Sequence, residues 1–162
     1  MSGTVELMEA AKSALVRGNA AEAARLLAEA RAIEPLRSDV HLRLALAHSA
    51  AGELELAWES AKEAQRLDSS DPAVYRAMAM MVRMMGRPGL GIQQLRAIMA
   101  TTPLLLSPVL HLALAELLAT TGDHQGLAGS LEILEAHEST VSPGTAEGLR
   151  MQARLWRELG DA

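Results

Sequence analysis

The chain has 162 residues, enough for one domain with a continuous core. Its net charge of −5 disfavours nonspecific binding to nucleic acid, and the lack of cysteine excludes disulfides and thiolate metal sites. Good helix formers are abundant and aromatic residues make up only 2% of the chain, so the composition favours an all-α protein.

No signal peptide is recognisable at the start of the chain, because residues 1–6 lack a basic region followed by an apolar core. The longer apolar stretches are interrupted by Arg or Glu, so no membrane span is predicted. We therefore expect a cytoplasmic protein. A periplasmic or membrane-associated parent chain would show the same two features.

The first two predicted helices cover residues 4–17 and 20–33. Between them Gly18 and Asn19 predict a turn, since both residue types tolerate positive φ. Four residues of the first helix are expected to face inward: Leu7, Ala10, Ala11 and Ala14. Because most of these are alanine, the hairpin buries little apolar area and depends on stacking against the next one.

The third predicted helix begins at Ser38, which can cap it, and the fourth covers Leu54–Leu67. His41 and His48 lie seven residues apart, on one helix face. They are candidates for a two-histidine metal site or for packing in place of aromatic residues. Packing is favoured, because no carboxylate or third histidine completes a ligand set. Trp58 either covers the hairpin or provides a self-association contact.

The fifth predicted helix starts at Pro72, with Asp71 as its cap, and ends at Gly86. Four of its residues recur at helical spacing and should form its buried face: Tyr75, Met78, Ala79 and Val82. Its methionines suit ordinary packing, a pliable docking surface or Cu(I) binding. Copper is disfavoured, because no cysteine or nearby histidine supports such a site.

Pro88 and Pro108 predict the starts of the sixth and seventh helices. Leucines 104–106 are interpreted as a plug at the end of a helical stack in preference to a ligand-contacting insertion. Gly126 and Gly129 lie in the eighth helix, and each should weaken it by about 1 kcal/mol relative to Ala.

The same features recur every 34 residues, with a last step of 36. The turn glycines are Gly18, Gly52, Gly86 and Gly122, and the matching small residues are Ala11, Ala45, Ala79 and Ala115. A fixed period in this range, with two helical patterns per period, predicts stacked helical hairpins.

The phased positions resemble the tetratricopeptide repeat family. The third unit shows the pattern of a large–small pair, a glycine turn, a small residue, large residues and a proline: Tyr75, Met78–Ala79, Gly86, Gly91, Leu95, Ile98 and Pro103. The resemblance covers about 4–37, 38–71, 72–105 and 108–141. It implies one domain over 1–162: an all-α, right-handed superhelical solenoid of four helix-turn-helix hairpins with a C-terminal capping helix at about 143–159.

No catalytic motif accompanies the repeats, so we expect no enzymatic activity and no cofactor. In the tetratricopeptide repeat family, which this sequence resembles, the first helix of each hairpin lines a concave groove that binds a partner peptide or helix. The matching positions are Met8, Lys12, Leu42, Leu46, Arg76, Met80, Arg83, Met84, Leu112 and Glu116. The family's clamp for a C-terminal carboxylate is disfavoured, because its positions read Met8, Lys12, Arg43, Ala73 and Ala77.

We therefore predict an adaptor or assembly subunit. Its groove should take an apolar helix or extended segment of another protein, with acidic groups matched to Lys12, Arg76 and Arg83. The scarcity of aromatic residues disfavours RNA as the partner. Two alternatives stay open: a small chaperone for a secreted or membrane-assembly client, and a scaffold that self-associates into a homo-oligomer.

Overall fold

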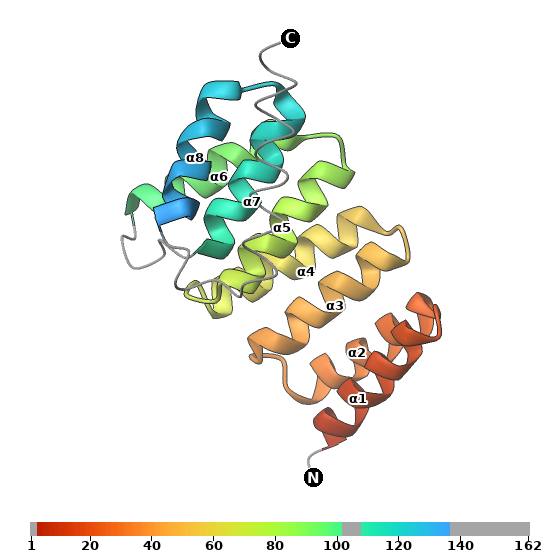
Figure 1. Cartoon of the computed structure of the whole chain (residues 1–162). Coiled ribbons are helices and arrows are strands. Elements are labelled where there is room, and N and C mark those ends of the chain that lie inside the picture. The colour runs from red at the N-terminus through yellow and green to blue at the C-terminus, as the bar shows by residue number, and fades with distance from the viewer. Residues whose placement is uncertain (1–2, 102–107, 137–162) are drawn as a thin grey trace. The chain divides into compact units, whose positions relative to one another are not determined.

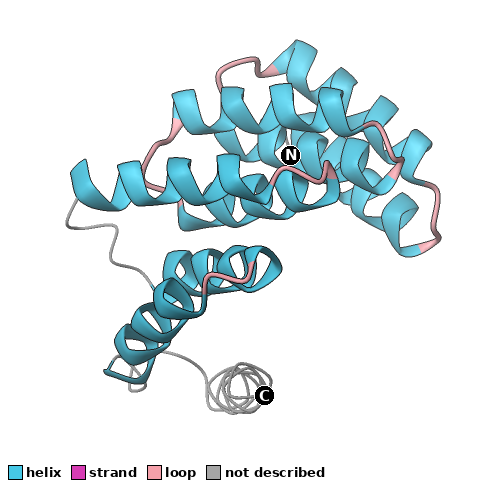
Figure 2. Cartoon of the chain, turned by 90° about the horizontal axis from the view of Figure 1, so that it is seen from above, coloured by secondary structure: helices cyan, strands magenta, loops and turns pink. Residues whose placement is uncertain are grey.

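The computed structural model describes residues 3–101 and 108–136, which form helices and the short turns between them (Figure 1). No strand occurs in these two ranges, as Figure 2 also shows. The chain divides into two compact units, residues 1–85 and 86–162, so the division falls within the predicted third repeat. The expected capping helix at 143–159 and leucines 104–106 lie outside the described residues.

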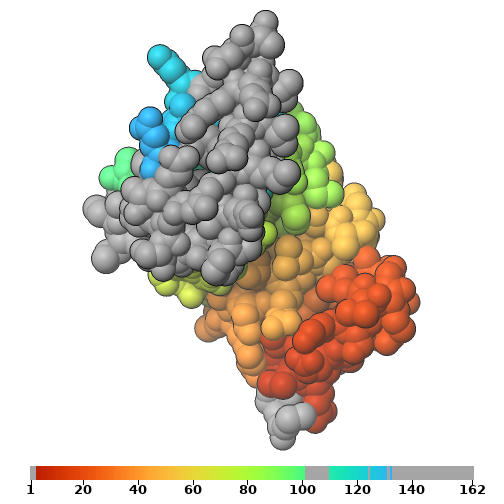
Figure 3. Space-filling view, in the orientation of Figure 1, coloured from red at the N-terminus to blue at the C-terminus, as the bar shows by residue number. Residues whose placement is uncertain are grey.

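The first unit is built from α1 (Gly3–Val16), α2 (Ala20–Ile33), α3 (Ser38–Ala50), α4 (Leu54–Leu67) and α5 (Pro72–Met84). Each helix packs against the one that follows it, and α5 also contacts α3. In the space-filling view of Figure 3, the red to orange surfaces of α1, α2 and α3 adjoin one another. This order of contacts is that of stacked helical hairpins, as the sequence predicts.

The second unit contains α6 (Pro88–Thr101), α7 (Pro108–Thr121) and α8 (His124–Ala136) among its described residues. Helix α7 packs against both α6 and α8. Proline is the first residue of α6 and α7, as predicted, because its fixed φ suits the first helical turn and its missing N–H leaves no donor unsatisfied there.

The helix–helix turns repeat with the predicted period. The four turn glycines have φ between 71° and 80°, a region that residues with a Cβ rarely adopt: Gly18, Gly52, Gly86 and Gly122. In the first two turns the following residue closes the helix end, since Asn19 N–H donates to Ala14 O and Glu53 N–H to His48 O, each at 2.9 Å. The same local geometry therefore recurs wherever the sequence repeats.

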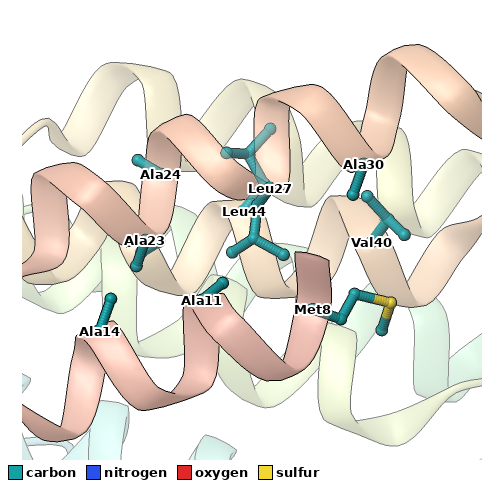
Figure 4. Packing of buried hydrophobic residues seen from close by; sticks show 10 residues of the cluster. Met8, Ala11, Ala14, Ala23, Ala24, Leu27, Ala30, Val40 and Leu44 are labelled. Atoms are coloured by element: carbon teal, nitrogen blue, oxygen red, sulfur yellow. The ribbon is translucent and has the colours of Figure 1, made fainter. Parts of the chain in front are cut away.

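The first core cluster joins α1, α2 and α3 (Figure 4). Its buried members are Met8, Ala11, Ala14, Ala23, Ala24, Leu27, Ala30, Val40, Leu44 and Ala47. Helices α1 and α2 contribute mainly alanine, whereas α3 contributes Val40 and Leu44 from the next hairpin. The first hairpin therefore gains much of its apolar burial from its neighbour, as the sequence indicates.

The buried face of α1 differs from the predicted one. Thr4, Met8, Ala11 and Ala14 are buried, whereas Ala10 is exposed. Helix α2 packs against α1, and the α1 residues in the first core cluster are Met8, Ala11 and Ala14. The expectation that Ala10 faces inward is therefore wrong.

The second core cluster joins α3, α4 and α5, and its buried members are Ala45, Ala57, Ala61, Ala64, Val74, Ala77, Met78 and Met81. Leu42 and Trp58 are partly buried against it. Trp58 therefore covers the hairpin, which is the first of its two predicted roles.

Two side chains donate hydrogen bonds to the loops between hairpins at equivalent positions, and we call these bonds the loop locks. His41 donates its Nε2–H to Pro35 O at 2.7 Å, and Tyr75 donates its hydroxyl to Ser69 O at 2.7 Å. The two donors are one repeat period apart in the sequence, and so are the two acceptors. His41 thus packs and hydrogen-bonds in the place of an aromatic residue, as predicted.

The helix starts use different caps. Asp71 caps α5, since its carboxylate accepts from Ala73 N–H at 2.9 Å. Ser38 is the first residue of α3, and its hydroxyl donates to Ala64 O of α4 at 3.1 Å. The prediction that Ser38 caps α3 is therefore wrong, and its hydroxyl links two helices instead.

Candidate functional site

The candidate surface for recognition lies on α1, α3 and α5, which follow one another along the first unit in Figure 1. We call it the A-helix face and define it by its solvent-exposed members: Lys12, Val16, Leu46, Arg76, Arg83 and Met84. All six residues belong to the first unit, and α3 and α5 are in direct contact.

The A-helix face exposes large apolar side chains. Val16 is 83% exposed, Met84 is 50% exposed and Leu46 is 38% exposed. Two predicted groove residues beside them, Leu42 and Met80, are partly buried. Exposed apolar side chains gathered on neighbouring helices are typical of protein-binding surfaces, whereas single ones are common on any surface.

One hydrogen bond ties the two central helices of this face together. The buried Ser49 hydroxyl on α3 donates to the Met84 sulfur on α5 at 3.4 Å. Sulfur is a weak acceptor, so this contact holds the exposed thioether beside α3 at small energetic gain. Spacing in the sequence does not reveal this bond, because the separation of the two residues exceeds the repeat period by one residue.

The cations of the A-helix face have no ion-pair partner among residues 3–101 and 108–136. Lys12, Arg76 and Arg83 are all exposed. Helix α5 carries Arg76 and Arg83 and no acidic residue at all. The chain as a whole carries a net charge of −5, so these unpaired cations stand out from its average charge. Cations without an ion-pair partner are available to acidic groups.

The charges on α2 and α4 are arranged differently. We call these charged residues the B-helix face: Glu22, Arg25, Glu29, Glu59, Lys62, Glu63 and Arg66. Arg25 pairs with both Glu22 and Glu29, Lys62 pairs with Glu59 at 2.7 Å, and Arg66 pairs with Glu63 at 2.6 Å. Arg31 of α2 is an exception, with no ion-pair partner in the described part of the chain.

These pairs perturb the carboxylates that form them. The hydrogen bond from Arg25 lowers the pKa of Glu22, and the hydrogen bond from Arg66 lowers the pKa of Glu63. Each ion pair connects residues three or four apart on one helix, where side chains are neighbours. The charges of the B-helix face are therefore satisfied within each helix.

The predicted groove residues do not all lie on this surface. Met8 is buried in the first core cluster beside Val40, so it is not available to a partner and is removed from the predicted set (Figure 4). It occupies the turn of α1 that faces α2 and α3. Leu112 and Glu116 lie on α7 in the second unit, where both are partly buried.

The two histidines of α3 have separate partners. His41 donates to Pro35 O, whereas His48 Nδ1–H donates to the Glu53 carboxylate at 2.6 Å in the next turn. Among the described residues, no group of three or more His, Asp or Glu side chains is placed to hold a metal ion. Within the same ranges, no helix is long and apolar enough to cross a membrane.

Comparisons with known proteins identify the fold. No protein-family model and no curated protein matches the sequence. Among solved structures, the chain is similar to the MamA protein, with a TM-score of 0.67 and 19% identity over 96% of this chain and 88% of that one. It is also similar to TTC0263, a thermophilic tetratricopeptide repeat protein of Thermus thermophilus, with a TM-score of 0.72 and 19% identity over 93% and 79% of the two chains.

A third structure with this fold contains a bound peptide. It is the second tetratricopeptide repeat domain of human RPAP3 in complex with an HSP70 peptide, with a TM-score of 0.60 and 13% identity over 71% of this chain and 94% of that one. The chain therefore has the tetratricopeptide-repeat fold. The predicted all-α class and helical solenoid are confirmed at that level.

Proposed function

We propose that this chain is a noncatalytic protein-interaction module. Its A-helix face binds an amphipathic segment of a partner protein. Apolar side chains of that segment contact Leu46 and Met84, and its acidic side chains pair with Arg76, Arg83 and Lys12. The observation that carries the proposal is the contrast in pairing: the cations beside the exposed apolar residues are unpaired, whereas most cations of α2 and α4 are neutralised within their own helices.

The physical case rests on what each group gains from a partner. Exposed apolar side chains gain free energy when they leave water, at roughly 25 cal/mol per Å² of buried area. An exposed arginine without a counter-ion loses no existing pair when a carboxylate approaches. Arg25 of α2 and Arg66 of α4 would first have to break an intrahelical pair. Complementary charge chiefly raises the association rate and the specificity.

The peptide complex of the RPAP3 domain supports the general mode, because a protein with the same fold binds a peptide that ends in Glu-Glu-Val-Asp. The positions of the carboxylate clamp differ here, since they read Met8, Lys12, Arg43, Ala73 and Ala77. We therefore place the acidic groups along the bound segment, opposite α5, with no requirement for a free C-terminus.

A peptide selection tests this proposal and requires no identified partner. The full chain, immobilised at low salt, selects from a random peptide library. We expect enrichment of segments that combine Asp or Glu with Leu, Ile or Met. The double variant Arg76→Glu/Arg83→Glu should bind the selected peptides at least tenfold more weakly, about 1.4 kcal/mol.

The matched control changes the same number of charges on the other face. Lys62→Glu/Arg66→Glu shifts the net charge equally but leaves the A-helix face intact, so it should bind like the unmodified chain. Circular dichroism verifies that both variants remain helical. Equal losses of affinity in the two variants, or selected peptides without acidic residues, would contradict the proposal.

A further inference from the structure

The methionines of α5 differ sharply in their access to solvent. Met78 is 5% exposed and Met81 is fully buried in the second core cluster. Met80 is partly buried, as is Met85 directly after the helix, and Met84 is 50% exposed. Among the described methionines of the whole chain, Met84 alone is classed as exposed. Exposure favours oxidation, so Met84 is the methionine of this helix that we expect a dissolved oxidant to modify first.

The surroundings of Met84 suit the oxidised form. The Ser49 hydroxyl is buried and donates to the Met84 sulfur at 3.4 Å. It is thus a donor close to any oxygen that oxidation adds to this sulfur. A sulfoxide oxygen is a stronger acceptor than a thioether, so the hydrogen bond would strengthen on oxidation.

We propose that Met84 is a site of reversible oxidation to methionine sulfoxide, and that the modification makes the centre of the A-helix face polar. In the reaction with hydrogen peroxide, the sulfur lone pair attacks one peroxide oxygen. The S–O bond forms as the O–O bond breaks, and the departing hydroxide takes the proton of the new S–OH group and leaves as water. The sulfur loses the two electrons that the peroxide gains.

Reduction by a thiol-dependent methionine sulfoxide reductase reverses the change: two thiols become a disulfide and the sulfoxide oxygen leaves as water. This inference rests on the proposed function, because oxidation matters to recognition only if Met84 contacts the partner. The sulfoxide replaces an apolar contact with a group that must be desolvated on binding, so it weakens the docking of an apolar side chain.

The first test maps the site without any ligand. The folded full chain is exposed to limited hydrogen peroxide, and the methionine-containing peptides are quantified by mass spectrometry. We expect Met84 to be oxidised at least tenfold faster than Met78 and Met81. Equal rates at the three positions in the folded chain would overturn the assignment.

The second test measures the change of surface. Oxidation should shorten retention of the unmodified chain in hydrophobic interaction chromatography, and Met84→Leu should show no such shift because it keeps an apolar group that peroxide does not attack. Unchanged retention of the oxidised chain would contradict the proposal that oxidation of Met84 makes this face polar, whether or not a ligand is known.

The library-selected peptide provides the third readout. Its affinity for the unmodified chain should fall about tenfold on oxidation and recover after reductase treatment, whereas the affinity of Met84→Leu should not change. If no peptide binds before oxidation, the proposed function fails while the mapping result stands. If the peptide binds the unmodified chain and its affinity does not change on oxidation of Met84, the proposed effect of oxidation fails while the proposed function stands.

Discussion

The A-helix face and the B-helix face of the first unit show how one repeat period can produce two different surfaces. Both faces lie over the same alanine-rich interior and carry several basic residues. On α2 and α4 most of these residues are paired with acids three or four positions away. On α5 there is no acid to pair with. Pairing within a helix thus stabilises that helix, and its absence leaves charge available for a partner.

The second unit extends the comparison. Arg96 of α6 contacts the carboxylate of Asp123 at 3.3 Å, and the same carboxylate accepts from Gly126 N–H at 2.9 Å at the start of α8. Helix α6 is the second helix of its predicted hairpin, like α2 and α4. Its Arg96 is also neutralised, here by Asp123, the acid that caps α8. Paired basic residues on the second helix of a predicted hairpin are therefore found in both units.

The largest expected effect on the free energy of unfolding comes from a substitution in the core that lies beneath both faces. Leu44 of α3 is fully buried in the first core cluster. Leu44→Ala should lower the free energy of unfolding by about 3 kcal/mol, because it removes buried methyl groups and leaves a cavity. Urea denaturation followed by circular dichroism measures this change. As a control, Leu36→Ala at a site that is 77% exposed should change it by less than about 0.5 kcal/mol.

Alanine substitutions at two glycines of α8 should have an intermediate effect on stability. A Cβ at Gly129 meets no atom within 4 Å, so Gly129→Ala should stabilise the protein by up to about 1 kcal/mol. At Gly126 a Cβ would lie 2.7 Å from an Asp123 carboxylate oxygen and 3.0 Å from Arg96 Nη2. Gly126→Ala should therefore lose the gain in helix propensity, because it disturbs the charge pair.

Thermal melts of the two alanine variants, side by side, measure this difference. An equal rise in Tm for both would show that the Arg96–Asp123 contact can move aside at no cost. The close approach at Gly126 adds a second effect to the predicted cost in helix propensity, since Gly126 leaves room for the capping carboxylate.

The smallest expected effect is a dependence of stability on acid pH. Hydrogen bonds from Arg66 and Arg25 lower the pKa values of Glu63 and Glu22 in the folded chain. The unfolded chain then binds more protons at acid pH, so this contribution is present above the ordinary glutamate pKa and is lost as pH falls through the lowered values. We expect the urea midpoint to decline below about pH 4.5.

A matched pair of variants assigns this decline to the B-helix face. Arg66→Ala removes a pairing cation and should flatten the acid limb slightly, whereas Arg76→Ala removes an unpaired one and should leave its shape unchanged. Both effects are small because the groups are exposed. Identical profiles for the two variants would contradict the difference in pairing.

Much of this fold could be predicted from the sequence, because its determinants are local. Gly18, Gly52 and Gly86 mark turns that need positive φ, and Pro72 and Pro88 mark helix starts, so helix boundaries follow from residue chemistry. The 34-residue period then predicts stacked hairpins, and the helix contacts of the first unit follow that order. For the same reason, the replacement of an aromatic residue by His41 could be recognised.

The site is less predictable, because burial depends on how far each helix is rotated against its neighbours. Met8 and Lys12 are one turn apart and share a predicted face, yet only Lys12 is exposed. The hydroxyl of Ser38 is predicted to cap its own helix but binds a carbonyl of α4. Tertiary contacts decide these cases, and no local pattern encodes them.

The loop locks carry a consequence for how such a chain grows. In each lock the acceptor is a main-chain carbonyl, so it is present whatever residue stands at position 35 or 69. A duplicated segment 38–71 would bring its own ring donor and offer its own carbonyl to the hairpin after it. Junctions between successive copies would thus be interchangeable, and the length of the array can change by whole periods without redesign of any joint.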